Sequence, residues 1–109
     1  MIKKIAKQYF KSWSNKDINS LEMYLDENCK LNDWENNLNN KSEILKHNED
    51  FFKENKIALK ILDIVSEGEI VFADLEITIN EEVVSVVDKL TFENNKIIEI
   101  KAFLKTNII

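Results

Sequence analysis

The sequence predicts an α+β domain in which three N-terminal helices pack on one face of a curved, mainly antiparallel sheet. Up to about residue 54, apolar side chains recur at the spacing of amphipathic helices, with one short strand among them. From residue 57 onward the period is strand-like, in runs rich in Ile, Val, Leu and Phe. Short polar joints separate these runs and favour antiparallel hairpins, because a parallel crossover needs about a dozen residues or more. The 109 residues suffice for one hydrophobic core, so we expect a single domain over residues 1–109.

Each of the three predicted helices has one inward side. The first begins near Ile2 and ends near residues 14–17. Asp17 or Asn15 can cap a shorter second helix, and Ser42 can cap a third, because short polar side chains accept hydrogen bonds from the free amides at a helix start. The inward sides consist of Ile2, Ile5, Ala6, Tyr9, Phe10 and Trp13, then Ile18, Leu21, Tyr24 and Leu25, and finally Ile44, Leu45, Asn48, Phe51 and Phe52.

Five strands are expected, joined by turns that contain almost no glycine. Residues 28–34 form a short strand and residues 35–40 a polar loop, while the four longer strands cover residues 57–65, 70–79, 83–92 and 97–105. Gly68 is the only glycine, and the chain has no proline. Asn, Asp and Lys must therefore make the turns, and Asn tolerates left-handed backbone best among them.

Three polar side chains interrupt the expected apolar faces. Strict alternation puts Asp33 on the same side of its strand as Leu31, and it puts Asp88 among the valines and leucine of residues 84–92. Tyr9 lies within the apolar stripe of the first helix. An ionised carboxylate is so costly to bury that the group finds a hydrogen bond, shifts its pKa or lines a cavity. The two aspartates therefore indicate a pocket.

Composition argues against several kinds of partner. The net charge is −5 and every positive charge is a lysine, which disfavours nucleic acid, because phosphate binding needs clustered cations and often arginine. The chain lacks an apolar run of about 20 residues and a signal-peptide pattern, so we expect no membrane partner and a cytoplasmic location. The lone Cys29 fits a reducing compartment, and one His with one Cys gives almost no support for zinc.

Two long segments resemble the nuclear transport factor 2-like superfamily, in particular its SnoaL-like and ketosteroid isomerase-like branch. The segments are "YFKSWSNKDINSLEMYLDENCKLNDW" and "VVDKLTFENNKIIEIKAF", and the order of elements matches over nearly the whole chain. The resemblance implies a cone-shaped fold with a pocket in its mouth and often a dimer formed through the outer sheet face. It does not fix an activity, because this fold hosts isomerases, dehydratases, cyclases, hydrolases and non-catalytic modules.

The resemblance also assigns roles to the three polar residues. Tyr9, Asp33 and Asp88 fall on the positions of the helix-1 tyrosine, the aspartate base and the protonated aspartate of ketosteroid isomerase. It implies that Asp33 removes a proton next to a carbonyl, while Tyr9 and a neutral Asp88 donate hydrogen bonds to the oxygen. Simpler alternatives stay open. Tyr9 can be a core aromatic, Asp33 can shape a turn, and Asp88 can pair with a lysine.

Other residues are expected to line the pocket. His47 and Asn48 stand where the related isomerases have aromatic residues, which makes this pocket more polar than a sterol site. Trp13 and, on the last strand, Ile100 and Leu104 are further candidates for ligand contacts, with Ile98 and Ala102 on the same strand face. Trp34 either rims the pocket or packs under the loop. The opposite face of the last strand, formed by Ile97, Glu99, Lys101, Phe103 and Lys105, is the expected dimer surface.

Three functions are compatible with these features. The first is an isomerase- or cyclase-type enzyme that performs proton transfer on a carbonyl compound without a metal or cofactor. The second is a non-catalytic protein that binds a small apolar or mixed-polarity organic ligand in the same pocket. The third is a dimeric interaction module whose sheet face is the functional surface.

Overall fold

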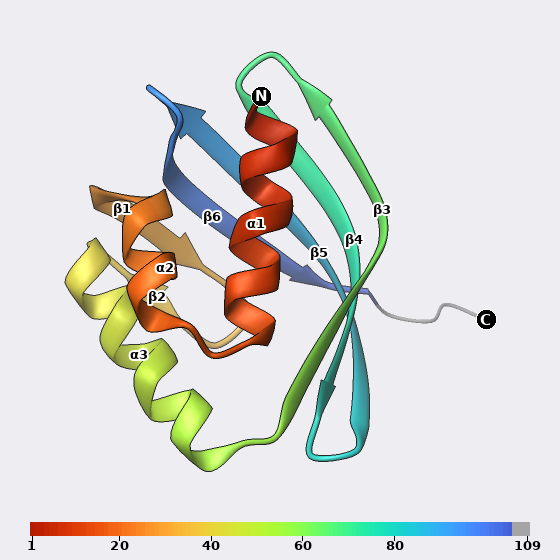
Figure 1. Ribbon diagram of the computed structural model, residues 1–109. Coiled ribbons are helices and arrows are strands. Elements are labelled where there is room, and N and C mark those ends of the chain that lie inside the picture. The colour runs from red at the N-terminus through yellow and green to blue at the C-terminus, as the bar shows by residue number, and fades with distance from the viewer. Residues whose placement is uncertain (106–109) are drawn as a thin grey trace.

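The computed structural model describes residues 1–105, which form three helices and a six-stranded sheet (Figure 1). The helices are α1 (Ile2–Ser14), α2 (Ile18–Tyr24) and α3 (Lys41–Glu54), and the strands are β1 (Leu25–Asn32), β2 (Asn37–Leu38), β3 (Ile57–Glu67), β4 (Ile70–Ile79), β5 (Glu82–Glu93) and β6 (Lys96–Leu104). The predicted α+β class and order of elements are confirmed. Several boundaries differ by one to three residues: the first strand runs from Leu25 to Asn32 rather than over residues 28–34, which leaves Asp33 and Trp34 in the loop after it, and β3, β5 and β6 differ from their predicted bounds by one or two residues. The polar loop contains the short strand β2.

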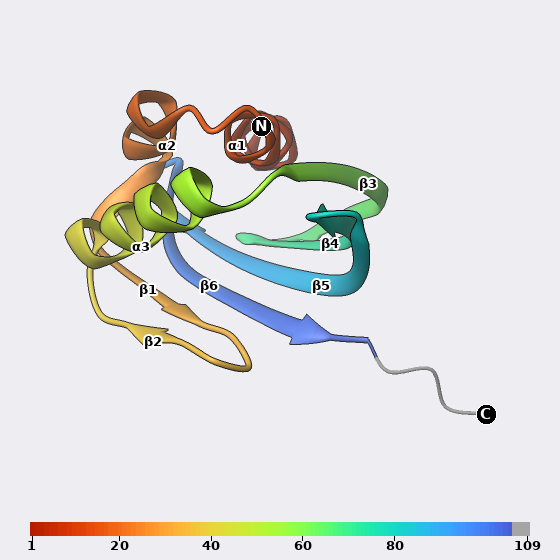
Figure 2. The ribbon, with the colours of Figure 1, turned by 90° about the horizontal axis from the view of Figure 1, so that it is seen from below.

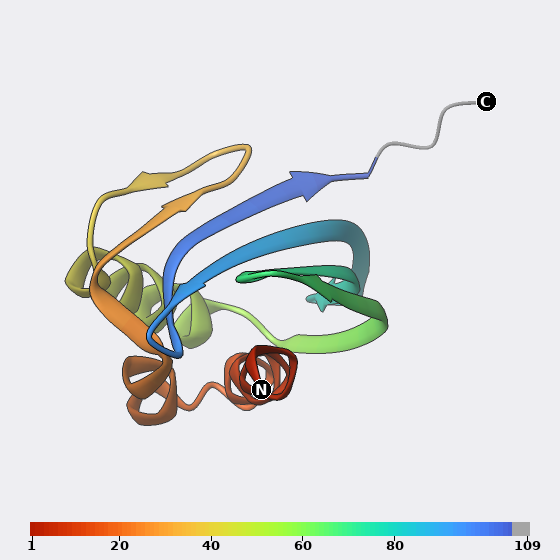
Figure 3. The same ribbon diagram turned by 90° about the horizontal axis from the view of Figure 1, so that it is seen from above.

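All three helices lie on the concave side of the sheet, which bends around them (Figure 2). The strand order is β2-β1-β6-β5-β4-β3, and every pairing is antiparallel except that of β1 with β6. Seen from above, β3, β4 and β5 curl towards α1, whereas β1 and β2 extend beside α3 (Figure 3). This arrangement is the predicted cone.

Side-chain caps fix the starts of α2 and α3. The Asp17 carboxylate accepts a hydrogen bond from the Ser20 amide at 3.1 Å, which confirms Asp17 as the cap of α2. The cap of α3 is Asn40, which accepts from the Glu43 amide at 2.9 Å. The prediction of Ser42 as this cap was wrong, because Asn40 has the extended backbone of a cap and lies three residues before an acidic partner.

Lysines satisfy carbonyls at the helix ends, where many proteins use glycine. The Lys16 ammonium donates to the carbonyl oxygens of Phe52, at 2.8 Å, and Asn55, at 2.6 Å, at the end of α3. Lys41 and Lys96 donate in the same way to carbonyls in the last turn of α2. These contacts join segments far apart in the sequence and help to hold the helices on the sheet.

Left-handed residues make the hairpin turns, as the scarcity of glycine predicts. Asn94 and Asn95 join β5 to β6 with φ of 51° and 62°. Asn80 and Glu81, with φ of 51° and 77°, join β4 to β5. Two consecutive positive φ angles match the twist of a two-residue hairpin, and Asn suits them. Glu81 is the unexpected member, because a long side chain is disfavoured there.

A bulge in β6 changes which of its residues face the core. Phe92 of β5 pairs with Ile97, whereas the preceding Thr91 pairs with Glu99, so Ile98 is an extra residue. Ile97 is therefore buried, as is Ile100. The prediction that Ile97 faces outward and Ile98 inward was wrong, because strict alternation fails at a bulge.

Candidate active site

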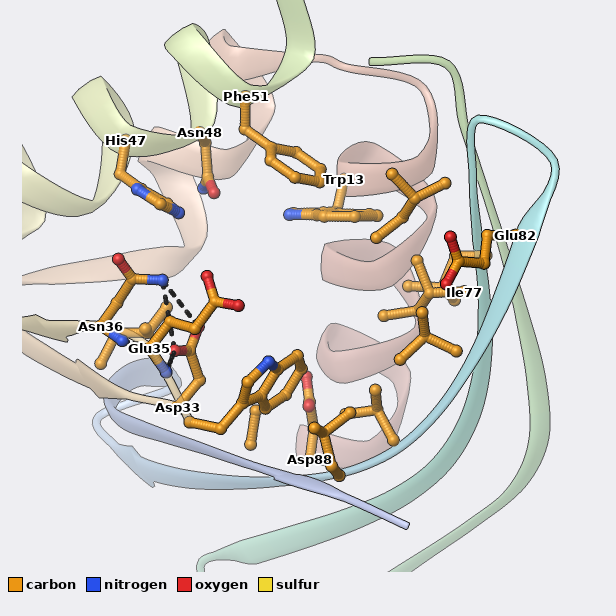
Figure 4. A pocket seen from close by; sticks show the side chains of 18 of the residues that line it. Trp13, Asp33, Glu35, Asn36, His47, Asn48, Phe51, Ile77, Glu82 and Asp88 are labelled. Atoms are coloured by element: carbon orange, nitrogen blue, oxygen red, sulfur yellow. Dashed lines mark hydrogen bonds between the residues drawn. The ribbon is translucent and has the colours of Figure 1, made fainter. Parts of the chain in front are cut away.

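A cavity of about 550 Å³ lies between α1, α3, the loop after β1 and the inner face of β3–β6 (Figure 4). Its volume is typical of small-molecule sites, which span about 300–1,000 Å³. Apolar lining comes from Trp13, Leu31, Trp34, Phe51, Leu59, Ile77, Ile79, Val84, Val86, Ala102 and Leu104, and polar lining from Asp33, Glu35, Asn36, His47, Asn48, Asn80, Glu82 and Asp88.

Asp88 presents its carboxyl to this cavity from the inner face of β5 (Figure 4). Its direct neighbours in the sheet are Ala73 on β4 and Ala102 on β6, and these small side chains leave room above the carboxyl. Burial raises the pKa of Asp88 from 3.8 to about 7, and the negative charge of Asp33 adds to the shift. No lysine among residues 1–105 forms an ion pair with it.

Asp33 lies just after β1, where it both shapes a turn and lines the cavity. One carboxylate oxygen accepts hydrogen bonds from the amides of Glu35, at 2.7 Å, and Asn36, at 2.6 Å. The Asn36 side-chain amide lies 3.2 Å from both Asp33 oxygens. The turn alternative is therefore confirmed, and it coexists with a place in the pocket. The same bonds fix where the carboxylate points.

Tyr9 belongs to the core and not to the lining of the cavity. The residue is 4% exposed, and its ring meets the Phe10 ring edge-on at 5.4 Å between centroids. Burial, followed by the charges of Asp88 and Cys29, raises the pKa of the Tyr9 hydroxyl. The tyrosine is therefore neutral at physiological pH. The Asp88 charge acts on the Tyr9 hydroxyl, so Tyr9 interacts electrostatically with a residue that lines the cavity.

Most of the other predicted pocket residues line the cavity. His47 and Asn48 project from α3, and Trp13 and Phe51 lie beside them (Figure 4). The His47 ring stacks on Phe51 with centroids 6.4 Å apart. Trp34, 47% exposed, lines the cavity, so the rim alternative holds for it.

Two residues on the inner side of β6 have different environments. Leu104 lines the cavity, whereas Ile100 is 2% exposed and lies in the core outside the lining. Ile100 therefore packs in the core, and a ligand in this cavity would contact Leu104 rather than Ile100.

Asn48 is the least satisfied polar group of the site. The residue is 5% exposed, and its side-chain nitrogen has no hydrogen-bond partner among the described residues. Figure 4 shows the amide directed towards the cavity. A buried amide without a partner is destabilising, so this group favours a ligand that can complete its hydrogen bonds.

Four polar lining residues were not predicted: Glu35, Asn36, Asn80 and Glu82. They lie in the loop after β1 and at the β4–β5 turn, segments that the sequence identified only as polar joints. Apart from their polarity, the sequence offers no signal that these two joints face the same cavity. Their meeting depends on the curvature of the sheet.

Within residues 1–105, no cluster of three or more His, Cys, Asp or Glu side chains is arranged to hold a metal ion. No helix in the same part of the chain is long and apolar enough to cross a membrane.

Solved structures with the same fold share little sequence with this chain. A candidate ketosteroid isomerase from Kribbella flavida DSM 17836 is 13% identical, with a TM-score of 0.90 over 99% of this chain and 80% of that one. A candidate polyketide cyclase from Sinorhizobium meliloti is 15% identical, with a TM-score of 0.84 over 91% and 93%. An epoxide hydrolase from M. tuberculosis, described as LEH-like, is 11% identical, with a TM-score of 0.83 over 95% and 82%.

The family assignment comes from the sequence itself. No curated protein matches the chain. The model of the SnoaL-like domain matches residues 6–100, which include both helical and sheet segments of the cone. This match confirms the resemblance drawn from the two sequence segments, and the chain belongs to the SnoaL-like domain family of the nuclear transport factor 2-like superfamily.

Proposed function

We propose that this protein is a small-molecule enzyme of the isomerase or cyclase type that catalyses proton transfer on a carbonyl compound without a metal. One observation carries the proposal: Asp33 and Asp88 face the same cavity, and the surroundings of Asp88 raise its pKa to about 7. Groups that titrate near neutral pH at a cavity are frequent in acid–base catalysis. The isomerase, cyclase and hydrolase names among the structural neighbours agree with a small-molecule substrate.

The two carboxyls would divide the chemistry. Asp33, oriented by the amides of its turn, is the proposed base that removes the proton next to the carbonyl. Asp88 in its protonated form is the proposed donor to the carbonyl oxygen, which becomes negative as the proton leaves. Because burial raises its pKa to about 7, Asp88 keeps its proton at pH values where an exposed aspartate has lost it.

Tyr9 has a supporting part in this proposal. Its hydroxyl is neutral and is influenced by the Asp88 charge, but the residue lies outside the cavity lining. We therefore assign Tyr9 as a positioning residue whose neutral hydroxyl dipole stabilises the ionised form of Asp88. Replacing it with Phe should raise the pKa of Asp88 further and shift the pH profile of the reaction to higher pH, which a merely structural role would not do.

The test is hydrogen–deuterium exchange next to the carbonyl of a set of enolisable ketones, followed by NMR in deuterated water. The parent protein should exchange faster than buffer, and Asp33→Asn should lose most of the increase. Asp50→Asn is the matched control, because Asp50 is exposed on α3 outside the lining. The enzyme proposal fails if no ketone exchanges above buffer, or if Asp33→Asn exchanges as fast as the parent.

The second candidate is a binding protein with the same cavity and no turnover. One observation favours it: Asp33 already receives hydrogen bonds from Glu35 and Asn36, which compete with a role as base. Binding of a small apolar or mixed-polarity organic molecule without exchange in the same NMR experiment would select this function.

We also propose a homodimer formed through the outer face of the sheet. Phe72 and Phe103 are 39% and 53% exposed there. Each pairs across strands with a second outer residue, Lys89 and Val87 respectively, which gives a mixed apolar and charged surface. Aromatic residues within a mixed surface are typical of subunit contacts.

A further inference from the structure

We propose that the ligand of this cavity carries both a protonated amine and a hydrogen-bond acceptor, as in a small amino ketone. The inference rests on the proposed role of the cavity as a ligand site, and it adds the charge of the ligand. It does not depend on whether the ligand is turned over.

The first support is the sign of the charged lining. The chain has 15 lysines and 20 acidic residues, yet three acidic residues besides Asp88, namely Asp33, Glu35 and Glu82, line the cavity, and none of the lysines in the described part of the chain does. Like charges repel strongly in a partly enclosed site. A carboxylate or phosphate ligand would meet repulsion, whereas an ammonium group would be attracted.

The second support is the aromatic part of the wall. Trp13 and Phe51 lie on the helix side with ring centroids 6.0 Å apart, and Trp34 lies on the loop side. Figure 4 shows Glu35 extending into the cavity from the loop, facing the side that carries Trp13. Aromatic faces attract cations, and tryptophan does so best. Carboxylates and tryptophans around one space suit an ammonium group better than a neutral apolar one.

The third support is independent of charge and comes from Asn48. Asn48 lines the cavity, and its side-chain nitrogen is enclosed by the protein and has no partner within residues 1–105. A turn of the amide would present this nitrogen to a carbonyl or hydroxyl oxygen on the ligand, which would accept the missing hydrogen bond. The site therefore favours a ligand with a cationic group and a hydrogen-bond acceptor, and an amino ketone has both.

Three matched ketones test the charge preference: 4-(aminomethyl)acetophenone, which is a cation, 4-methylacetophenone, which is neutral, and 4-acetylbenzoate, which is an anion. Both tryptophans of the chain line the cavity, so their indole N–H signals in NMR report directly on binding there. At low salt the cationic ketone should bind about tenfold more tightly than the neutral one, and the anion most weakly.

Two variants assign the effect to residues. Glu35→Gln should reduce the preference for the cation over the neutral ketone several-fold, whereas Glu49→Gln, an exposed position on α3 outside the lining, should leave it unchanged. Asn48→Leu should weaken the cationic ketone more than it weakens 4-methylbenzylamine, which has the ammonium group without the carbonyl.

The outcomes separate this inference from the proposed enzyme. Equal or tighter binding of the neutral or anionic ketone overturns it, and so does the absence of any indole shift with the cationic ketone at 10 mM. A preference for the cationic ketone without deuterium exchange supports the amine ligand and contradicts only the proposed enzyme activity. Deuterium exchange of the neutral ketone without a preference for the cation supports the enzyme activity and contradicts the amine ligand.

Discussion

Replacing Asp88 with Asn should stabilise the protein at neutral and alkaline pH and have little effect at pH 4. In the folded protein the pKa of Asp88 is raised from 3.8 to about 7 by burial and by the charge of Asp33. The folded state therefore holds a proton that the unfolded state has released between these two values. Stability falls as pH rises through this window, because the unfolded state binds fewer protons.

The size of the effect follows from the pKa difference. About three units at about 1.4 kcal/mol each correspond to about 4 kcal/mol, and solvent screening in the open cavity reduces this to about 2–4 kcal/mol. Small domains have total stabilities of about 5–15 kcal/mol, so the change is large. Asn has the shape of Asp but no charge, and it removes this contribution at every pH.

The assay is urea unfolding of the parent, Asp88→Asn and the control Asp50→Asn at intervals from pH 4 to pH 8. The difference between Asp88→Asn and the parent should grow with pH, whereas the difference for Asp50→Asn should stay small. Subtracting the free energy of unfolding of the parent from that of the variant at each pH cancels the contribution of every group that titrates alike in both proteins. A difference that does not change with pH would refute the raised pKa, and with it the reason for assigning Asp88 as a neutral donor.

Three further changes test the fold and the assembly. Glu81→Gly should raise the free energy of unfolding by about 0.5–1 kcal/mol in urea titrations, because φ is 77° there, whereas Asn95→Gly at φ 62° should gain less. Lys16→Met should lower stability by about 1–2 kcal/mol, because two carbonyls at the end of α3 lose their donor, and Lys7→Met on exposed α1 surface should not. Phe103→Asp should halve the mass seen by light scattering, and a monomeric parent would contradict the proposed dimer.

Periodicity predicted the helices and strands well because each element buries one face. It failed where the pattern itself was broken. The bulge at Ile98 brought Ile97 into the core, and no local feature of an isoleucine pair marks which of the two is extra. The cap of α3 was misplaced by two residues because Asn40 and Ser42 are both good caps, and in the structure it is the Asn40 side chain that accepts from the Glu43 amide.

For the site, the sequence predicted which side of an element faces inward but not how deep each position lies. Trp13 and Tyr9 share one side of α1, one turn apart, yet only Trp13 lines the cavity. Leu104 and Ile100 differ in the same way on β6. In both elements the later residue lies towards the open end of the cone, where the helices and the sheet diverge. That divergence depends on sheet curvature, which side-chain periodicity does not encode.

The inner face of β5 gives the strongest argument that the cavity is a functional site. A carboxyl with a raised pKa and no ion pair within residues 1–105 costs stability in its ionised form, and a valine or leucine at position 88 would cost none. The neighbouring Ala73 and Ala102 keep the space above it open, although larger side chains there would bury more apolar surface. Three adjacent positions thus favour an accessible carboxyl over a well-packed core. Neighbouring residues that together lower the stability of the folded protein are expected at sites of binding or catalysis.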